Sequence, residues 1–313
     1  MDILFVLAGL ALLCLGAEFL IRGAVALALR MGITPLVVGL TVVAFGTSSP
    51  EIVVGIKAAI DGNGGIAVGS VIGSNICNIG LILAIGALVR PISVQLKLLR
   101  KDLPILLGAT LLIPLTMIGG TISRIEGSLL LAALVAYLLF NLHESRTAHS
   151  PEADREYQDE LNRSAFSPWK TGFHLLGGLV GLIAGGRLLL LGGVNLATSV
   201  GVSEAVIGLT VVAFGTSLPE LATTVMAARR GHGDIAIGNA IGSNLMNLTA
   251  VLGISAFVRP LGMSGVERFD IAVMIALTAV LLPLMRSGFV LNRLEGALLL
   301  ACYGGYIVST ALG

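Results

Sequence analysis

Two glutamates, Glu51 and Glu220, lie within long apolar segments and are the side chains with the clearest capacity for chemistry. An ionised carboxylate in hydrocarbon costs several kcal/mol, so such a residue normally faces the protein interior and has a partner. Neither glutamate has a basic residue in its motif, and the neighbouring side chains carry neutral oxygens instead. We therefore interpret the pair as candidate ligands of a cation.

Each glutamate ends the same motif, Phe-Gly-Thr-Ser-x-Pro-Glu, at residues 45–51 and 214–220. The proline lacks an amide donor and clashes with the preceding turn, while the glycine loosens the backbone. We expect each helix to break or kink here and to free carbonyls, which are tolerated at membrane depth only where they line a cavity or bind something. The expected oxygen donors are the carbonyls of Ala44, Thr47, Ala213 and Thr216 and the hydroxyls of Thr47, Ser48, Thr216 and Ser217.

A second motif, Gly-Ser-Asn-x-x-Asn, occurs at residues 73–78 and 242–247. Its serine and its second asparagine are four residues apart and therefore share one helix face. We interpret these side chains as further oxygen donors, with hydrogen bonding between helices as the alternative role. They are Ser74, Asn78, Ser243 and Asn247. The intervening Asn75 and Asn244 face elsewhere on their helices, and we assign them a structural role.

The donor set consists of hard oxygens, with no histidine and no sulfur ligand common to both copies. Such oxygens suit Ca²⁺, Na⁺ or Mg²⁺ and argue against Zn²⁺, and Mg²⁺ is disfavoured because it dehydrates reluctantly. Two ionised glutamates neutralise one divalent cation or a small set of Na⁺ ions. The site would thus be nearly neutral when loaded and strongly negative when empty. Moving an empty site past apolar walls would be costly, which is a physical basis for obligatory exchange.

The composition places these motifs in a membrane. Hydrophobic residues make up 56% of the 313 residues and charged residues 12%, whereas soluble domains have about 25% charged residues. A net charge of +1 gives no case for a nucleic-acid partner. We predict an all-α polytopic membrane protein with ten transmembrane helices. The predicted spans are 3–29, 33–60, 64–89, 102–119, 123–142, 171–199, 203–228, 233–258, 270–286 and 290–312.

The basic residues predict an orientation for these ten spans. With the N-terminus outside, thirteen of the 19 Lys and Arg residues fall at cytoplasmic ends and four at outside ends. We therefore expect a multi-pass protein of the cytoplasmic membrane with its N-terminus outside. The one hydrophilic stretch, 143–170, is interpreted as a cytoplasmic linker between a first half, 1–142, and a second half, 171–313.

Residues 39–78 and 208–247 are copies of one segment. Aligned without a gap at an offset of 169, they are identical at 24 of 40 positions, and Glu51 and Glu220 are equivalent. With five spans in each half, the second half must enter the membrane from the opposite side. We predict two inverted five-helix repeats with broken helices meeting at the centre. This architecture is common among secondary transporters, whose binding sites lie near the midplane.

The paired motifs on inverted five-span halves resemble the repeats of the calcium/cation antiporter superfamily, in its prokaryotic sodium/calcium exchanger branch. The resemblance implies alternating access, with inward Na⁺ flow driving Ca²⁺ extrusion. It implies that Glu51, Glu220 and the carbonyls of Thr47 and Thr216 hold Ca²⁺. It also implies flanking Na⁺ sites completed by Ser48, Ser74, Ser217, Ser243 and the carbonyls of Ala44 and Ala213, with Asn78 and Asn247 lining the centre. Some relatives carry an acid at the position of Asn247, which in potassium-dependent members is tied to K⁺ use, so the amide argues against K⁺ dependence.

The same residues are compatible with functions other than Na⁺/Ca²⁺ exchange. Because buried carboxyl groups can also exchange protons, antiport of Ca²⁺ against H⁺ is the first alternative. A cation channel with the same oxygens as a filter is a weaker one, since one duplicated chain does not form a visible subunit ring. An enzyme is not expected, because the spans contain no nucleophile–base pair and no set of metal-binding histidines. Beyond Ca²⁺, Na⁺ and the lipid bilayer, we expect no cofactor and no protein partner.

Overall fold

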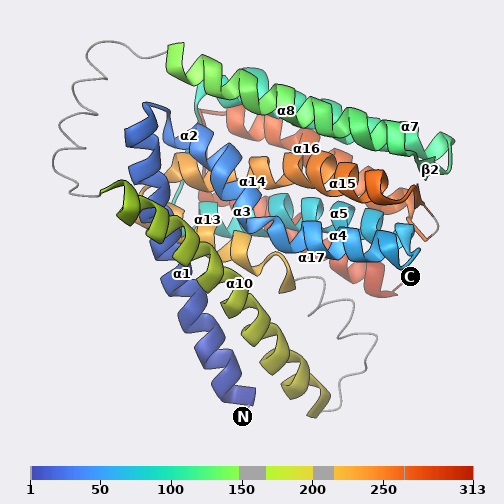
Figure 1. Cartoon of the computed structure of the whole chain (residues 1–313), viewed down its shortest axis with the longest axis horizontal. Helices are drawn as coiled ribbons and strands as arrows, with labels where there is room; N and C mark the ends of the chain where they lie inside the picture. The colour runs from blue at the N-terminus through green and yellow to red at the C-terminus, as the bar shows by residue number, and fades with distance from the viewer. Residues whose placement is uncertain (1, 148–166, 200–214, 264, 313) are drawn as a thin grey trace.

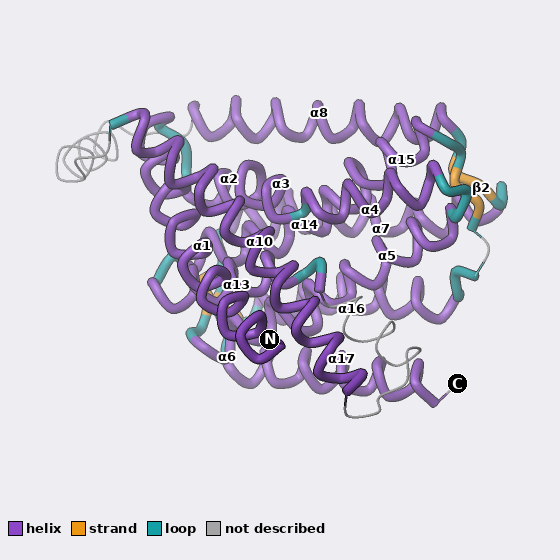
Figure 2. The backbone as a smooth tube through the Cα atoms, turned by 60° about the horizontal axis from the view of Figure 1, so that its bottom comes forward, coloured by secondary structure: helices purple, strands orange, loops and turns teal. Residues whose placement is uncertain are grey.

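The structure is a computed structural model, which describes residues 2–147, 167–199, 215–263 and 265–312. These residues are almost entirely helical, with short strands only at the ends of the bundle (Figures 1 and 2). The predicted helical class is therefore confirmed for the described part of the chain. Of the predicted span 203–228, residues 203–214 lie outside it.

The first half contains five long helical segments. They are α1 (Asp2–Met31); α2 (Pro35–Val38), η1 (Gly39–Val43), α3 (Ala44–Thr47) and α4 (Ser49–Ile60); α5 (Gly64–Cys77), η2 (Asn78–Leu83) and α6 (Ala84–Val89); η3 (Leu98–Asp102) and α7 (Leu103–Ile118); and α8 (Arg124–Thr147). The η segments are π-helical. Strands β1 (Ile92–Ser93) and β2 (Thr121–Ile122) stand before η3 and after α7.

The second half follows the same order in its described part. Its helices are α10 (Pro168–Ser199), α13 (Leu218–Arg230), α14 (Gly233–Met246), η5 (Asn247–Val251), α15 (Leu252–Val258), α16 (Arg268–Arg286) and α17 (Arg293–Leu312). Its strands are β3 (Leu261–Gly262) and β4 (Val290–Leu291). In both halves a π-helical turn begins at the last asparagine of the Gly-Ser-Asn-x-x-Asn motif, Asn78 or Asn247.

Six helical segments in the described ranges are long and apolar enough to cross a membrane. They are Asp2–Met31, Gly64–Val89, Arg124–Ser145, Pro168–Leu196, Gly233–Val258 and Arg268–Arg286. A seventh is obtained if the bent segment from Pro35 to Ile60 is counted as one span. The predicted spans 102–119, 203–228 and 290–312 overlap α7, α13 and α17, which do not meet these criteria by themselves. The count of ten therefore stays a prediction.

The predicted kink at the first glutamate motif is present. Helix α3 ends at Thr47, Ser48 leaves the helical conformation with φ −81° and ψ 5°, and α4 starts at Ser49 with its axis bent by 47°. Pro50 cannot donate to the carbonyl four residues earlier, which belongs to Gly46. The Ser49 hydroxyl donates to that carbonyl at 2.7 Å and replaces the missing bond.

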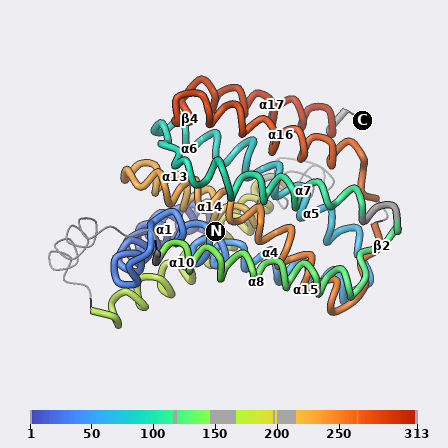
Figure 3. The backbone as a smooth tube through the Cα atoms, turned by 90° about the horizontal axis from the view of Figure 1, so that it is seen from above, coloured from blue at the N-terminus to red at the C-terminus, as the bar shows by residue number. Residues whose placement is uncertain are grey.

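Two short antiparallel strand pairs connect the halves. Ile92 and Ser93 of β1 pair with Leu291 and Val290 of β4, and β2 pairs with β3 in the register Thr121 to Gly262 and Ile122 to Leu261. By the offset of 169, β3 is the repeat equivalent of β1 and β4 that of β2. Because β1 precedes α7 and β2 follows it, the two pairs lie at opposite ends of the bundle (Figure 3).

Helices α1 and α10 pack against each other at one side of the bundle (Figure 1). Their contact depends on glycine: a Cβ on Gly9 would lie 2.8 Å from the Gly185 carbonyl oxygen, and one on Gly178 would lie 2.8 Å from that of Gly16. Backbones can approach this closely only where no side chain intervenes. The bundle core is formed by α5–α6 and α14–α15, whose apolar windows are 78% and 83% buried. These helices place the two copies of the Gly-Ser-Asn-x-x-Asn motif in the bundle core.

Two ion-pair clusters fix helix ends. Glu18 and Arg22 pair at 2.8 Å as expected from their spacing, and Arg230 at the end of α13 also binds the Glu18 carboxylate, at 2.6 Å. Helix α8 continues to Thr147, five residues beyond the predicted span end at 142. The reason is tertiary: Glu144 in its last turns binds Lys97, at 3.1 Å, and Lys101.

Candidate cation-binding site

The two glutamates occupy equivalent places in the broken helices. Glu51 lies in the first turn of α4 and Glu220 in the first turn of α13, where the helix N-terminus favours negative charge. Their exposed fractions are 3% and 1%, so both carboxylates are withdrawn from solvent. Among the described residues neither forms an ion pair with a basic side chain.

Hydroxyl groups join each glutamate to the other half of the chain. The Ser48 hydroxyl, at the break between α3 and α4, donates to Glu220 Oε1 at 3.1 Å. In the other half, the Thr216 side chain lies beside the Glu51 carboxylate. Each carboxylate thus faces the motif that contains the other. The structure thus brings the two copies of the Phe-Gly-Thr-Ser-x-Pro-Glu motif together.

The four motif asparagines form a reciprocal network between α5–η2 and α14–η5. Asn75 and Asn244 each donate their side-chain amide to the other's backbone carbonyl, at 3.3 Å. Asn78 Nδ2 donates to Asn244 Oδ1 at 2.9 Å, and Asn247 Nδ2 donates to Asn75 Oδ1 at 3.1 Å. These bonds fix the amide orientation of Asn78 and Asn247 and leave their Oδ1 atoms without a donor. The structural role assigned to Asn75 and Asn244 fits this geometry.

Five buried oxygens of the predicted site have no hydrogen-bond partner: Glu51 Oε2, Glu220 Oε2, Ser217 Oγ, Asn78 Oδ1 and Asn247 Oδ1. A buried acceptor without a donor is costly, so such a group calls for an explanation. Carboxylate, hydroxyl and amide oxygens in one region are the ligands that Ca²⁺ and Na⁺ prefer. Cations bound in this region would supply the missing partners.

The remaining predicted donors lie in different surroundings. Ser74 and Ser243 are buried, and the Ser243 hydroxyl lies 3.4 Å from that of Thr47. Thr216 is half-buried. Ala213 lies outside the described residues. The break does not free the Ala44 carbonyl, because this oxygen accepts the Ser48 amide at 3.0 Å. The carbonyl that loses its amide donor to Pro50 is that of Gly46, and the Ser49 hydroxyl donates to it instead.

One buried residue of this region, Asn239 on α14, was not predicted from the sequence. Its Oδ1 accepts the Thr47 hydroxyl at 3.1 Å, and its Nδ2 donates to the Glu220 carbonyl at 3.2 Å and to Thr224 Oγ1 at 3.0 Å. Asn239 thereby connects α3 to α13. The repeat equivalent is Ser70, so a comparison of identical positions misses it, although a polar residue in both copies is a usable signal.

We predict that Asn239→Ala weakens ion binding without touching a ligand. The variant removes the group that holds the Thr47 hydroxyl and the Glu220 backbone, and loss of such supporting bonds typically lowers metal affinity by roughly 10–100-fold. Isothermal titration of the purified protein with CaCl₂ measures the change in apparent affinity. Asn239→Ser, which installs the residue of the other repeat, should lose less. Equal affinity in all three proteins, with unchanged thermal stability, would remove Asn239 from the site.

The fold and the buried oxygens together define a helical membrane transporter. The family described as sodium/calcium exchanger protein matches residues 1–143 and 171–311 of this chain. The chain therefore belongs to the sodium/calcium exchanger family, and it is a transporter and not an enzyme.

Individual relatives cover nearly the whole chain. Sodium/calcium exchanger MaX1 of Methanosarcina acetivorans is 32% identical, covering 98% of this chain and 97% of its own. Inner membrane protein YrbG of Escherichia coli is 40% identical, covering 80% of this chain and 78% of its own. The solved structure of the sodium/calcium exchanger from Methanococcus jannaschii superposes with a TM-score of 0.84 at 31% identity, covering 98% of this chain and 97% of that one. The membrane fold is thus shared over its full length.

Proposed function

We propose that this protein exchanges Na⁺ for Ca²⁺ across the cytoplasmic membrane by alternating access. The observation that carries the proposal is the set of five unpartnered buried oxygens. Two of them belong to carboxylates that have no basic partner in the described chain. Two archaeal relatives, both named as sodium/calcium exchangers, support the same pair of ions.

The proposed Ca²⁺ ligands are the carboxylates of Glu51 and Glu220 and the carbonyls of Thr47 and Thr216. Ca²⁺ accepts 6–8 flexible oxygen ligands, and two carboxylates balance its charge. The flanking Na⁺ sites use the same glutamates with four serines and two carbonyls: Ser48, Ser74, Ser217, Ser243, Ala44 and Ala213. Asn78 and Asn247 line the centre. The Ala44 carbonyl would serve as a ligand in addition to accepting the Ser48 amide.

Exchange rather than one-way transport follows from the charge of this site. With both glutamates ionised and no ion bound, two negative charges would lie in surroundings that exclude water. An empty site therefore costs more to carry between the two membrane faces than one neutralised by Ca²⁺ or by Na⁺. The same arithmetic argues against a channel, in which ions pass without movement of the site.

We propose the inverted arrangement of two five-helix repeats, 1–142 and 171–313, joined by a cytoplasmic linker at 143–170, with ten spans and the N-terminus outside. The strand registers support it: the repeat offset converts the β1–β4 pair into the β3–β2 pair. These pairs lie at opposite ends of α7, so the operation that relates the halves also exchanges the two ends of the bundle. Such an axis lies in the membrane plane.

Ion replacement in proteoliposomes tests the proposed function. Vesicles loaded with Na⁺ and diluted into Na⁺-free medium should accumulate radiolabelled Ca²⁺, and vesicles without a Na⁺ gradient should not. The control is a pH gradient at equal Na⁺ on both sides, which should drive no uptake. Uptake that follows the pH gradient and ignores Na⁺ would favour H⁺ coupling. Ca²⁺ currents that need no counter-ion would indicate a channel, and either result would overturn Na⁺/Ca²⁺ exchange.

A further inference from the structure

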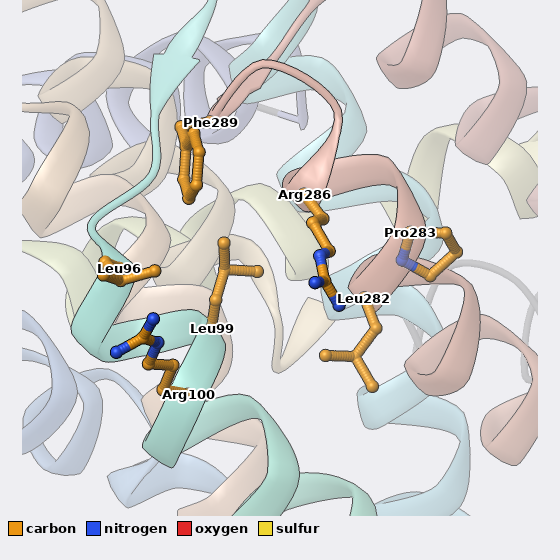
Figure 4. Close-up of a pocket in the computed structure, with 7 residues that line it drawn as sticks. All are labelled: Leu96, Leu99, Arg100, Leu282, Pro283, Arg286 and Phe289. Atoms are coloured by element: carbon orange, nitrogen blue, oxygen red, sulfur yellow. The ribbon is translucent and has the colours of Figure 1, made fainter.

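A cavity of about 520 Å³ opens between η3 and the end of α16 (Figure 4), and neither glutamate lines it. Two arginines contribute to its wall, Arg100 from η3 and Arg286 from the last turn of α16. The other lining residues are apolar: Leu96, Leu99, Leu282, Pro283 and Phe289. An apolar hollow with a small number of charged groups is the usual form of a binding site.

Among the described residues, no ion pair and no side-chain hydrogen bond engages either arginine of this cavity. In the described chain, the ion pairs involve Arg22, Arg230, Lys57, Lys97 and Lys101. Arg124, Arg259 and Arg293 donate to backbone carbonyls. Arg100 and Arg286 do neither and are exposed, and Figure 4 shows them on either side of Leu99 in this view. Two guanidinium groups beside apolar surface are therefore available to an anion.

The backbone is strained at Phe289, whose aromatic ring lines the cavity. Phe289 has φ +56°, a conformation that bulky residues rarely adopt, directly after Gly288 at φ +75°. Its carbonyl accepts the Val94 amide at 2.8 Å, which ties this turn to β1. The Phe289 side chain is 46% exposed and lines the cavity. Strain of this kind persists where surrounding bonds enforce it, and it clusters at binding sites.

The repeat provides an internal comparison at the opposite end of the bundle. The equivalents of Arg100 and Arg286 are Phe269 and Met117, and the equivalent of Phe289 is Gly120. The paired arginines and the aromatic ring thus belong to one end only. In the orientation proposed above, this end faces the cytoplasm, where the membrane surface is rich in anionic lipids.

We propose that this cavity binds an anionic phospholipid, with its phosphate beside Arg100 and Arg286 and its acyl chains against Leu96, Leu282 and Phe289. The chemistry is complementary on both counts, since arginine recognises phosphate well and the leucines and the aromatic ring match a hydrocarbon chain. The inference needs the membrane fold but not the identity of the transported ions. It can therefore hold or fail independently of Na⁺/Ca²⁺ exchange.

Lipid retention in detergent tests this site. Purified full-length protein is mixed with equal amounts of phosphatidylglycerol and phosphatidylcholine of identical acyl chains, and the bound lipid is identified by native mass spectrometry. The wild type should retain phosphatidylglycerol preferentially. Arg100→Gln and Arg286→Gln should each weaken that preference about fivefold, and the double variant about thirtyfold, from the attraction of one basic residue for an anionic membrane surface.

The matched control is Arg268→Gln, an exposed arginine of the other end that stands at the repeat position of Leu99. It should retain the lipid as the wild type does. Preference in the double variant equal to that in the control would overturn the proposal, and so would complete displacement of the lipid by millimolar inorganic phosphate. A mass spectrum in which the cavity variants instead lose a dimer would assign this face to a second copy of the chain. If the double variant does not fold, the two single variants decide.

Discussion

Glu51→Gln and Glu220→Gln should each reduce Na⁺-gradient-driven Ca²⁺ uptake by roughly a hundredfold or more. Glutamine preserves the shape of the side chain and one oxygen, but it removes the charge that balances the ion. Loss of a charged partner from a buried, water-excluded site costs about 3–5 kcal/mol, which corresponds to at least two orders of magnitude in binding. Radiolabelled Ca²⁺ uptake into proteoliposomes at equal protein content measures the loss.

The control for this prediction is Asp61→Asn, which removes an exposed carboxylate that pairs with Lys57 just after α4. Its uptake should equal that of the wild type, since exposed pairs contribute little. Glu51→Asp, which keeps the charge but shortens the side chain, should retain part of the activity. Normal Ca²⁺ uptake in both glutamine variants would contradict the proposed ligand roles and leave the unpartnered oxygens unexplained.

Gly242→Val should destabilise the protein by about 3 kcal/mol or more, the upper range for overpacking a close contact. A Cβ at this position would lie 2.7 Å from both the Leu40 carbonyl oxygen and Ala44 Cβ. These are atoms of the backbone and its first side-chain carbon, which cannot rotate away. The clash would separate α14 from η1 and α3, next to the ion site. Thermal unfolding of the purified protein measures the effect.

Gly108→Val is the matched control for Gly242, because a Cβ there would have no heavy atom within 4 Å. Valine has a higher intrinsic helix propensity than glycine, so this variant should be neutral or slightly stabilising. A similar melting temperature for the two variants would mean that the approach of α14 to the broken helix is not tight.

The features that the sequence predicts well are those with a local cause. The break before Glu51 follows from Pro50 and Gly46, and the structure bends there by 47°. Duplication indicated that Glu220 has the same surroundings, and both carboxylates are buried in first helical turns. The motif spacing also separated Asn75 and Asn244, which bond to each other, from the asparagines that keep a free oxygen.

The features that the sequence did not predict depend on contacts between distant segments. Asn239 acts through its bonds to two other helices, and its repeat equivalent is a different residue. Strands of two residues have no periodicity to detect, so the pairs β1–β4 and β2–β3 could not be expected. The extension of α8 to Thr147 depends on Lys97 and Lys101, which lie more than forty residues earlier. From composition alone, the polar turns that carry Glu144 are assigned to the linker.

The strand pairs β1–β4 and β2–β3 make the two duplicated halves depend on each other. Neither copy can complete its own strands, because every backbone bond of a pair crosses to the other copy, at one end of the bundle and again at the other. The two ancestral units have thereby become mutually dependent parts of a single cooperative body. Deleting either unit would remove one glutamate of the proposed site and also the strands with which the remaining unit pairs.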